Sequence, residues 1–147
     1  MNDTRYDVLK LENQLCFPLY AASREIIKRY RPYLDALELT YTQYLALMVL
    51  WETETVSAKV LGEKLFLDSG TLTPVLKSLA EKGLIHRCRS REDERVLMLS
   101  LTEKGAALKE QAVAIPGKIA GCVNLSPEDA RALYRLIYKL LHDTTTT

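Results

Sequence analysis

The sequence contains few cysteines, no long hydrophobic run and almost no net charge. Cys16, Cys88 and Cys122 are odd in number and widely separated, which fits neither a disulfide framework nor a set of zinc ligands, so we expect no metal or cofactor. The longest apolar run, YLALMVLW, is too short to cross a bilayer, and no signal-peptide pattern occurs, so we expect a cytoplasmic protein. Because the formal net charge is only +1, nucleic-acid binding requires a local basic patch.

Helical periodicity dominates both ends of the chain, whose 147 residues suffice for a single domain, residues 1–147. A first helix is predicted from about Asn13 to near Pro32, with an opening turn loosened by Pro18, which cannot donate a backbone hydrogen bond. Thr40 and Gln43 have the spacing of a capping box and are expected to open a second helix.

Two shorter helices are expected next, the third capped by Ser57 and the fourth by Asp68. The fourth has an alternative start at Thr73, with Pro74 in its first helical position, and Gly83 is expected to end it. The side chains predicted to face inward from the second, third and fourth helices are Tyr44, Leu47, Met48, Trp51, Val60, Leu61, Leu65, Leu72, Val75, Leu76 and Leu79.

The pattern then changes from helix to strand. LIHRCR and RVLMLSL are strand-like runs joined by the polar SREDE, which predicts a two-stranded hairpin. Helices joined by a short turn and followed by a hairpin indicate a winged helix-turn-helix over about 40–101. The predicted fold class is therefore mainly α with a small β-hairpin wing.

Further helices flank this winged core. Thr102 is expected to cap a fifth helix, Ser126, Pro127 and Asp129 open the last one, and the tail TTTT is expected to be unstructured. The last helix carries an apolar stripe made of Ala130, Leu133, Tyr134, Ile137, Leu140 and Leu141. We expect residues of about 7–36 and 102–143 to form dimerisation helices; the alternative is that these helices cover the core of their own chain.

The fourth helix would be the reading helix of the helix-turn-helix, lying in the major groove of DNA. Its predicted outward face carries short polar side chains that suit phosphates and base edges: Ser69, Thr71, Thr73, Pro74, Lys77 and Ser78. Because no Arg, Asn or Gln stands on this face for bidentate base contacts, shape readout should contribute strongly. A pseudo-palindromic operator is expected.

The predicted hairpin tip is rich in charge of both signs. Its basic members are candidates for phosphate or minor-groove contacts, namely Arg87, Arg89, Arg91 and Arg95. Asp93 is expected to orient one of these arginines through a charged hydrogen bond. A charge run alone would favour an ordinary solvated tip, but its place after a helix-turn-helix favours DNA binding.

Cys16 and two tyrosines share one stripe of the first helix. At 100° per residue, Tyr20 and Tyr30 each lie about 40° from Cys16, on opposite sides. The rise from Cys16 to Tyr30 is about 21 Å, too far for a tyrosine side chain. A Tyr30 that contacts a Cys16 thiol must therefore belong to another protomer, as in an antiparallel pairing about a two-fold axis.

The early helical position and nearby phenols would favour the thiolate of Cys16 and make it susceptible to peroxide. A sulfenic acid forms first, and a second thiol can trap it as a disulfide. The alternative is that Cys16 is a small buried apolar residue among packing tyrosines. Cys88 lies between Arg87 and Arg89, but strand alternation points it away from both, so a structural or incidental role is expected.

Four stretches of the sequence carry a family resemblance: LENQLCFPLY, YRPYLDALELTYTQYLALMVLWE, LDSGTLTPVLK and REDERVLMLSLTEKG. They resemble the MarR family of dimeric winged-helix regulators, and within it the organic-hydroperoxide-sensing repressors called OhrR. The resemblance implies that Cys16 is the peroxide-reactive thiol and that Tyr20, Tyr30 and Tyr41 bind it, some from the other subunit. It also implies repression in the reduced state and release of DNA on oxidation. Cys122 lies where some relatives carry a second cysteine, which implies an intersubunit disulfide with Cys16, whereas other relatives use a low-molecular-weight thiol.

Three functions are therefore weighed. The leading one is a homodimeric repressor that an organic hydroperoxide switches off through Cys16. The second is a MarR-like repressor that answers a small aromatic ligand while Cys16 stays inert. The third is a thiol peroxidase, which is not favoured because no catalytic constellation or C-x-x-C motif accompanies Cys16, so no enzyme is expected.

Overall fold

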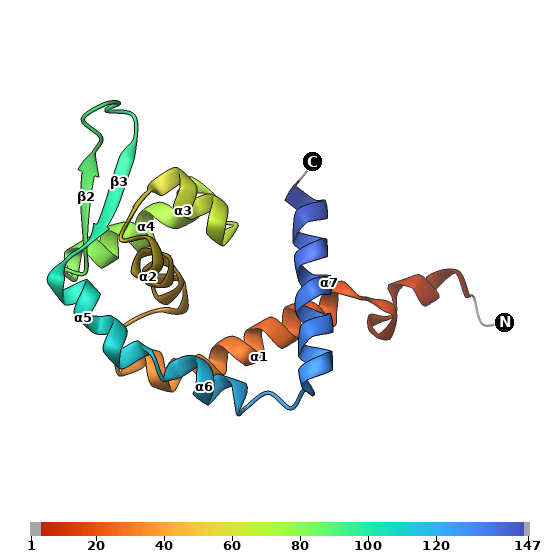
Figure 1. The fold of residues 1–147 in the computed structure, drawn as a ribbon. Helices are drawn as coiled ribbons and strands as arrows, with labels where there is room; N and C mark the ends of the chain where they lie inside the picture. Colours follow the sequence, from red (N-terminus) through yellow and green to blue (C-terminus); the bar gives the residue numbers. More distant parts are fainter. Residues whose placement is uncertain (1–3, 146–147) are drawn as a thin grey trace. The chain divides into compact units, whose positions relative to one another are not determined.

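The computed structural model describes residues 4–145 and divides the chain into two compact units, Met1–Ile115 and Pro116–Thr147 (Figure 1). The first unit contains the 3-10 helices η1 (Thr4–Leu9) and η2 (Leu11–Asn13), then α1 (Cys16–Asp35), α2 (Tyr41–Thr53), β1 (Thr55–Ser57), α3 (Ala58–Leu65), α4 (Ser69–Glu81), β2 (Ile85–Arg89), β3 (Leu97–Leu101) and α5 (Glu103–Ala112). At the boundary begins α6 (Ile115–Ala120), and α7 (Pro127–Thr145) belongs to the second unit.

The wing is a three-stranded antiparallel sheet in the order β1-β3-β2. The expected hairpin forms from β2 and β3, with Cys88 opposite Met98. The sheet also contains a third strand that was not predicted, because β1 pairs with β3 and sets Val56 opposite Leu99. Val56 is 6% exposed and Leu99 is fully buried, so burial of this pair fixes the short strand in place.

The helix starts in the first unit follow the predicted caps. Thr40 and Gln43 form the capping box of α2, with the Gln43 backbone N–H donating to Thr40 Oγ1 at 3.3 Å and the Thr40 N–H donating to Gln43 Oε1 at 3.1 Å. Asp68 Oδ1 accepts from the Thr71 backbone N–H at 2.8 Å, so α4 begins after Asp68 and the alternative start at Thr73 was wrong. The Ser57 and Thr102 caps are also confirmed.

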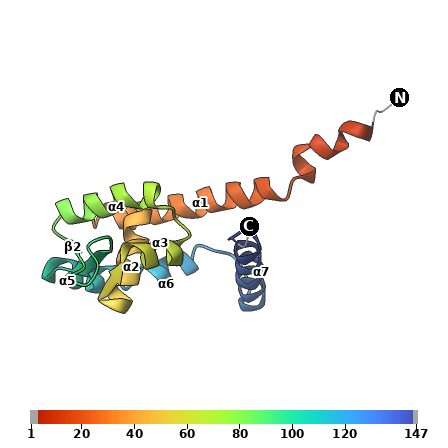
Figure 2. The ribbon, with the colours of Figure 1, turned by 90° about the horizontal axis from the view of Figure 1, so that it is seen from above.

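The core of this unit lies around α2, which contacts α1, α3, α4, α5 and the sheet (Figure 2). Its largest fully buried side chains are Leu47, Leu50, Leu61, Leu76, Leu79 and Leu99. Two residues predicted to face inward do not: Met48 is 41% exposed and Val60 is 40% exposed. Both lie at the edge of an apolar stripe, where helical spacing alone does not show how far the neighbouring elements reach.

The first long helix is shifted along the chain from its prediction. This helix starts at Cys16, so Pro18 lies in its first turn. A backbone N–H in the first turn has no acceptor within the helix, so the missing N–H of Pro18 does not loosen the helix start. The helix also continues past Pro32 to Asp35. Leu34, in this last part, is 2% exposed, so core packing stabilises the turn beyond the proline.

The second unit contains α7 with the predicted start. The Asp129 backbone N–H donates to Ser126 Oγ at 3.1 Å, while the Asp129 carboxylate accepts from the Ser126 hydroxyl at 2.9 Å. Thr144 and Thr145 belong to α7, so the tail is partly helical, and its last two residues lie outside the described range. Within residues 4–145, no helix combines the length and apolar character needed to span a bilayer.

Candidate functional site

Cys16 is the first residue of α1, and its side chain is exposed. At this position the first backbone N–H groups of the helix have no acceptor within the helix, and the helix dipole presents partial positive charge. The preceding residue, Leu15, has no polar side-chain atom with which to cap the helix. The expected early helical position is therefore confirmed, and the interpretation of Cys16 as a small buried apolar residue does not hold for the single chain.

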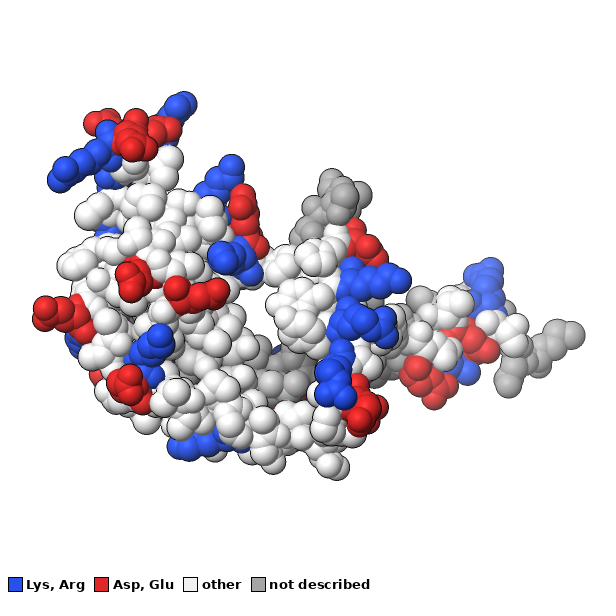
Figure 3. Space-filling model, in the orientation of Figure 1, with Lys and Arg blue, Asp and Glu red and all other residues white. Residues whose placement is uncertain are grey.

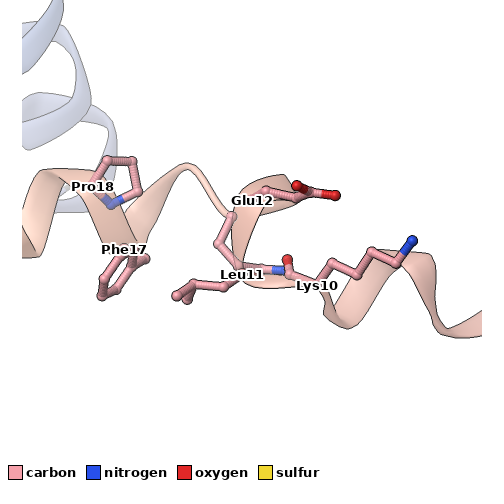
Figure 4. Close-up of a pocket in the computed structure, with 6 residues that line it drawn as sticks. Lys10, Leu11, Glu12, Phe17 and Pro18 are labelled. Atoms are coloured by element: carbon pink, nitrogen blue, oxygen red, sulfur yellow. The ribbon is translucent and has the colours of Figure 1, made fainter.

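An open pocket of about 640 Å³ adjoins this helix start. Figure 4 shows the Leu11 side chain reaching toward the Phe17 ring, while Pro18 stands on the other side of the ribbon. The remaining lining residues are Lys10, Glu12 and Gln14. Because Phe17 directly follows Cys16, apolar surface lies next to the thiol-bearing residue.

Tyr20 lies one turn beyond Cys16 and is 59% exposed. The guanidinium carbon of Arg24 lies 5.3 Å from the centre of the Tyr20 ring. A cation over the face of an exposed aromatic ring is weakly attracted to it.

Tyr30 and Tyr41 meet at the other end of α1. Their ring centres are 4.9 Å apart, and Tyr44 completes the cluster at 6.0 Å from Tyr30 and 6.3 Å from Tyr41. Burial raises the pKa of all three phenols above the usual value, so the hydroxyl groups remain protonated donors near neutral pH. Tyr44 was predicted only as a core residue; its spacing of three residues from Tyr41 is the signal that could have added it to the cluster.

The structure does not bring Cys16 and Tyr30 together within one chain. Both lie on the same uninterrupted helix, and their separation along its axis is about 21 Å. Tyr41 packs against Tyr30 and so belongs to the same distant end. In one chain these residues therefore lie at two separate ends of α1, a thiol end with Cys16 and Tyr20 and a phenol end with Tyr30 and Tyr41.

The other two cysteines are also exposed. Cys122 lies in the turn that follows α6, where its backbone N–H donates to the Ile119 carbonyl at 2.9 Å. Cys88 is the fourth of the five residues of β2, and Arg87 and Arg89 beside it are exposed as well.

The outward face of α4 carries five of the six residues expected there, all of them exposed: Ser69, Thr71, Thr73, Pro74 and Lys77. The Thr73 hydroxyl donates to the Ser69 carbonyl of the same helix at 2.7 Å. The prediction of an outward Ser78 was wrong, because Ser78 Oγ accepts from Gln43 Nε2 at 2.9 Å and faces α2. A helix of this length presents one stripe to DNA, and Ser78 lies on the packed side.

The tip of the wing gathers basic and acidic side chains (Figure 3). Arg95 Nε donates to Asp93 Oδ1 at 3.1 Å and Arg95 Nη2 donates to Asp93 Oδ2 at 3.3 Å. These bonds from Arg95 hold the pKa of the Asp93 carboxyl below its usual range. Asp93 thus orients one arginine, as expected, and Arg87, Arg89 and Arg91 are also exposed.

Comparison with known proteins agrees with this architecture. A family model described as "Transcriptional regulator SarA/Rot" matches residues 25–112. The organic hydroperoxide resistance transcriptional regulator of Bacillus subtilis is 58% identical over 139 residues, which cover 95% of each chain. This similarity extends through both units of the chain.

Solved structures of regulators have the same fold. Reduced AbfR bound to DNA, a protein of Staphylococcus epidermidis, is 35% identical with a TM-score of 0.76, covering 94% of this chain and 97% of AbfR. The disulfide form of AbfR is 33% identical with a TM-score of 0.65 over 96% of this chain and 99% of its own. A mutant of MarR from Escherichia coli on operator DNA, 23% identical with a TM-score of 0.74 over 86% and 93% of the two chains, shows the fold alone. The chain belongs to the MarR family of winged-helix, DNA-binding transcriptional regulators and is of the organic hydroperoxide resistance (OhrR) type.

Proposed function

We propose that this protein is a cytoplasmic, homodimeric repressor that releases its operator when an organic hydroperoxide oxidises Cys16. The observation that carries the proposal is the exposed thiol on the first residue of α1, in a chain 58% identical to an organic hydroperoxide resistance regulator. The Cys16 thiolate attacks one peroxide oxygen, the O–O bond breaks, and the alkoxide leaves and takes up a proton. Sulfur is oxidised to the sulfenic acid and the peroxide is reduced to the alcohol.

Dimerisation is supported by the separation of the thiol end and the phenol end of α1. An antiparallel pairing of two α1 helices would place the partner subunit's Tyr30 and Tyr41 beside Cys16, since one chain cannot do so. The apolar stripe of α7 is also largely exposed in the single chain; Leu133 is 44%, Tyr134 66% and Leu140 43% exposed. A second copy covering such surface would stabilise the assembly.

DNA binding is assigned to two elements of the winged core. The exposed face of α4, with Ser69, Thr71, Thr73, Pro74 and Lys77, enters the major groove. The wing arginines Arg87, Arg89, Arg91 and Arg95 contact phosphates or the flanking minor groove, and Asp93 aims Arg95. A dimer then reads a pseudo-palindromic operator.

The sulfenic acid is resolved by a second thiol. Its sulfur attacks the oxidised Cys16 sulfur, the disulfide forms, and water leaves. We assign this role to Cys122 of the partner subunit, supported by its exposed position and by a structure of AbfR described as disulfide formed. A low-molecular-weight thiol is the competing resolver.

The deciding experiment compares wild type, Cys16→Ser and the matched control Cys88→Ser. The DNA is first selected from a random pool by the reduced wild-type protein. Binding of each protein to this DNA is then measured at fixed salt, before and after treatment with one equivalent of cumene hydroperoxide. We expect wild type and Cys88→Ser to lose DNA binding after peroxide treatment and to regain it with dithiothreitol. Cys16→Ser should keep its DNA binding throughout. Peroxide-induced release by Cys16→Ser would assign the sensing to another residue.

A further inference from the structure

Gln43 is the one buried polar or charged side chain among the residues that the structure describes, at 5% exposure. Its Oε1 accepts from the Thr40 backbone N–H at 3.1 Å and from Lys82 Nζ at 2.9 Å. Its Nε2 donates to Ser78 Oγ at 2.9 Å. Each polar atom of this amide is therefore engaged, as a buried polar group requires.

These bonds join α2 to α4. Ser78 belongs to α4 and Lys82 caps its C-terminal end, so two of the contacts hold the helix assigned to DNA reading. Lys82 Nζ also donates to the carbonyl oxygen of Glu38, in the turn between α1 and α2. Lys104 Nζ in turn donates to the Lys82 carbonyl at 2.9 Å. The end of α4 is thus bonded directly to the junction of α1 and α2.

The same junction holds one of the tyrosines assigned to the thiol. Tyr41 is the first residue of α2, and Gln43 follows it two positions later in the same helical turn. A hydrogen-bonded turn moves as a unit, so a displacement of Tyr41 displaces the Gln43 amide with it. Close-packed contacts between α2 and α4 then carry that shift to the reading helix.

We propose that Gln43, with Ser78 and Lys82, couples the oxidation state of Cys16 to the position of α4. These are positioning residues: they contact neither the oxidant nor, through this network, the DNA. The inference rests on the proposed function and adds the path by which a change at the tyrosines reaches the operator. The amide acts as a rigid link because breaking one of its bonds leaves a buried polar atom unpaired.

The test measures the ratio of operator dissociation constants between oxidised and reduced protein for wild type, Ser78→Ala and Lys82→Met. Ser78→Thr keeps a hydroxyl at the same place and is the conservative control, and Lys28→Met removes a surface lysine of α1 that pairs with Glu25. Mass spectrometry verifies that Cys16 is oxidised to the same extent in each protein.

We expect the ratio to shrink about tenfold in Ser78→Ala and in Lys82→Met and to keep its wild-type value in both controls. If these residues had a merely structural role, their substitution would lower Tm and weaken operator binding equally in both redox states. The ratio of dissociation constants would then stay unchanged, and that result overturns the proposal. Should Ser78→Ala fail to fold, Lys82→Met decides alone. A wild type whose affinity does not respond to oxidation refutes the proposed function itself, which separates the two failures.

Discussion

Trp51 Nε1 donates to the carbonyl oxygen of Gly105 at 2.9 Å, and this bond ties α2 to the first turn of α5. Gly105 is itself buried, and its lack of a side chain lets α5 lie close to the backbone of Leu84. A Cβ at this position would overlap the backbone carbonyl of Leu84 and press on the Leu101 side chain. The close packing of α5 on the winged core therefore requires glycine here.

Gly105→Ala should lower the free energy of unfolding by about 3 kcal/mol or more, because backbone rather than a flexible side chain must move. Urea denaturation followed by Trp51 fluorescence measures the change. Gly117→Ala is the matched control: its Cβ meets open space, and alanine in α6 should add about 0.5–1 kcal/mol through helix propensity. Equal stability of the two variants would contradict the close approach.

Leu99→Ala should cost about 2–5 kcal/mol, because Leu99 is fully buried at the centre of the sheet and its loss leaves a cavity. Its neighbour on the same strand, Met98, is only partly buried, so Met98→Ala should cost distinctly less. Thermal unfolding of both variants, monitored by circular dichroism, ranks them. The opposite order would place the core on the other face of the sheet.

Alkaline pH should destabilise the first unit through its tyrosine cluster. Burial raises the folded-state pKa of Tyr41 above its unfolded value of about 10, so its stabilising contribution is complete below pH 10 and is lost as the pH rises further. Phenolate absorbance should appear later in the folded than in the unfolded protein. Tyr41→Phe should remove one late-titrating group; a titration unchanged by this substitution would show that Tyr41 ionises normally.

The sequence predicted those parts of the fold that depend on neighbours along the chain. The Thr40–Gln43 capping box and the Asp68 cap are local hydrogen bonds, and residue type with spacing identifies them. It did not predict β1, since three residues carry no periodicity and the strand exists only because Val56 pairs with distant Leu99. Ser78 was misplaced for a similar reason: its partner, the buried Gln43 amide, belongs to another helix.

The candidate site likewise contains features that the sequence predicts and one that it does not. The helical start around Cys16 and the bond from Arg95 to Asp93 follow from short sequence distances. The contact of Tyr44 with Tyr30 depends on how α1 and α2 pack, which no spacing within one helix encodes.

Arg95→Ala should weaken binding of the selected operator about tenfold at fixed salt and lower the slope of log affinity against log salt by about one. Asp93→Asn should have a smaller effect, because the arginine remains but loses its charged partner. Arg131→Ala, an exposed arginine of α7 paired with Glu128, is the matched control and should bind as wild type does. Fluorescence anisotropy at several salt concentrations decides; full affinity in Arg95→Ala would remove that residue from the interface.

Peroxide-treated wild type should run as a covalent dimer on a non-reducing gel, and Cys122→Ser should not, while Cys88→Ser should still cross-link. Mass spectrometry of the tryptic digest should identify a peptide pair joined through Cys16 and Cys122. A treated wild-type protein that remains entirely monomeric on the gel would instead favour an external thiol, and the same digest would reveal its adduct on Cys16.

The short strand β1 lies in the chain directly between α2 and α3, and it pairs with β3 of the wing. The wing is therefore not a loose arm but is joined to the helix-turn-helix through backbone hydrogen bonds at Thr55–Ser57. Each copy of the chain consequently holds α4 and the wing at one fixed separation, and the proposed dimer would carry this fixed pair to each half of its operator. An inserted base pair within a half-site should abolish recognition whatever the redox state, whereas one inserted between the half-sites tests only the spacing that oxidation is proposed to change.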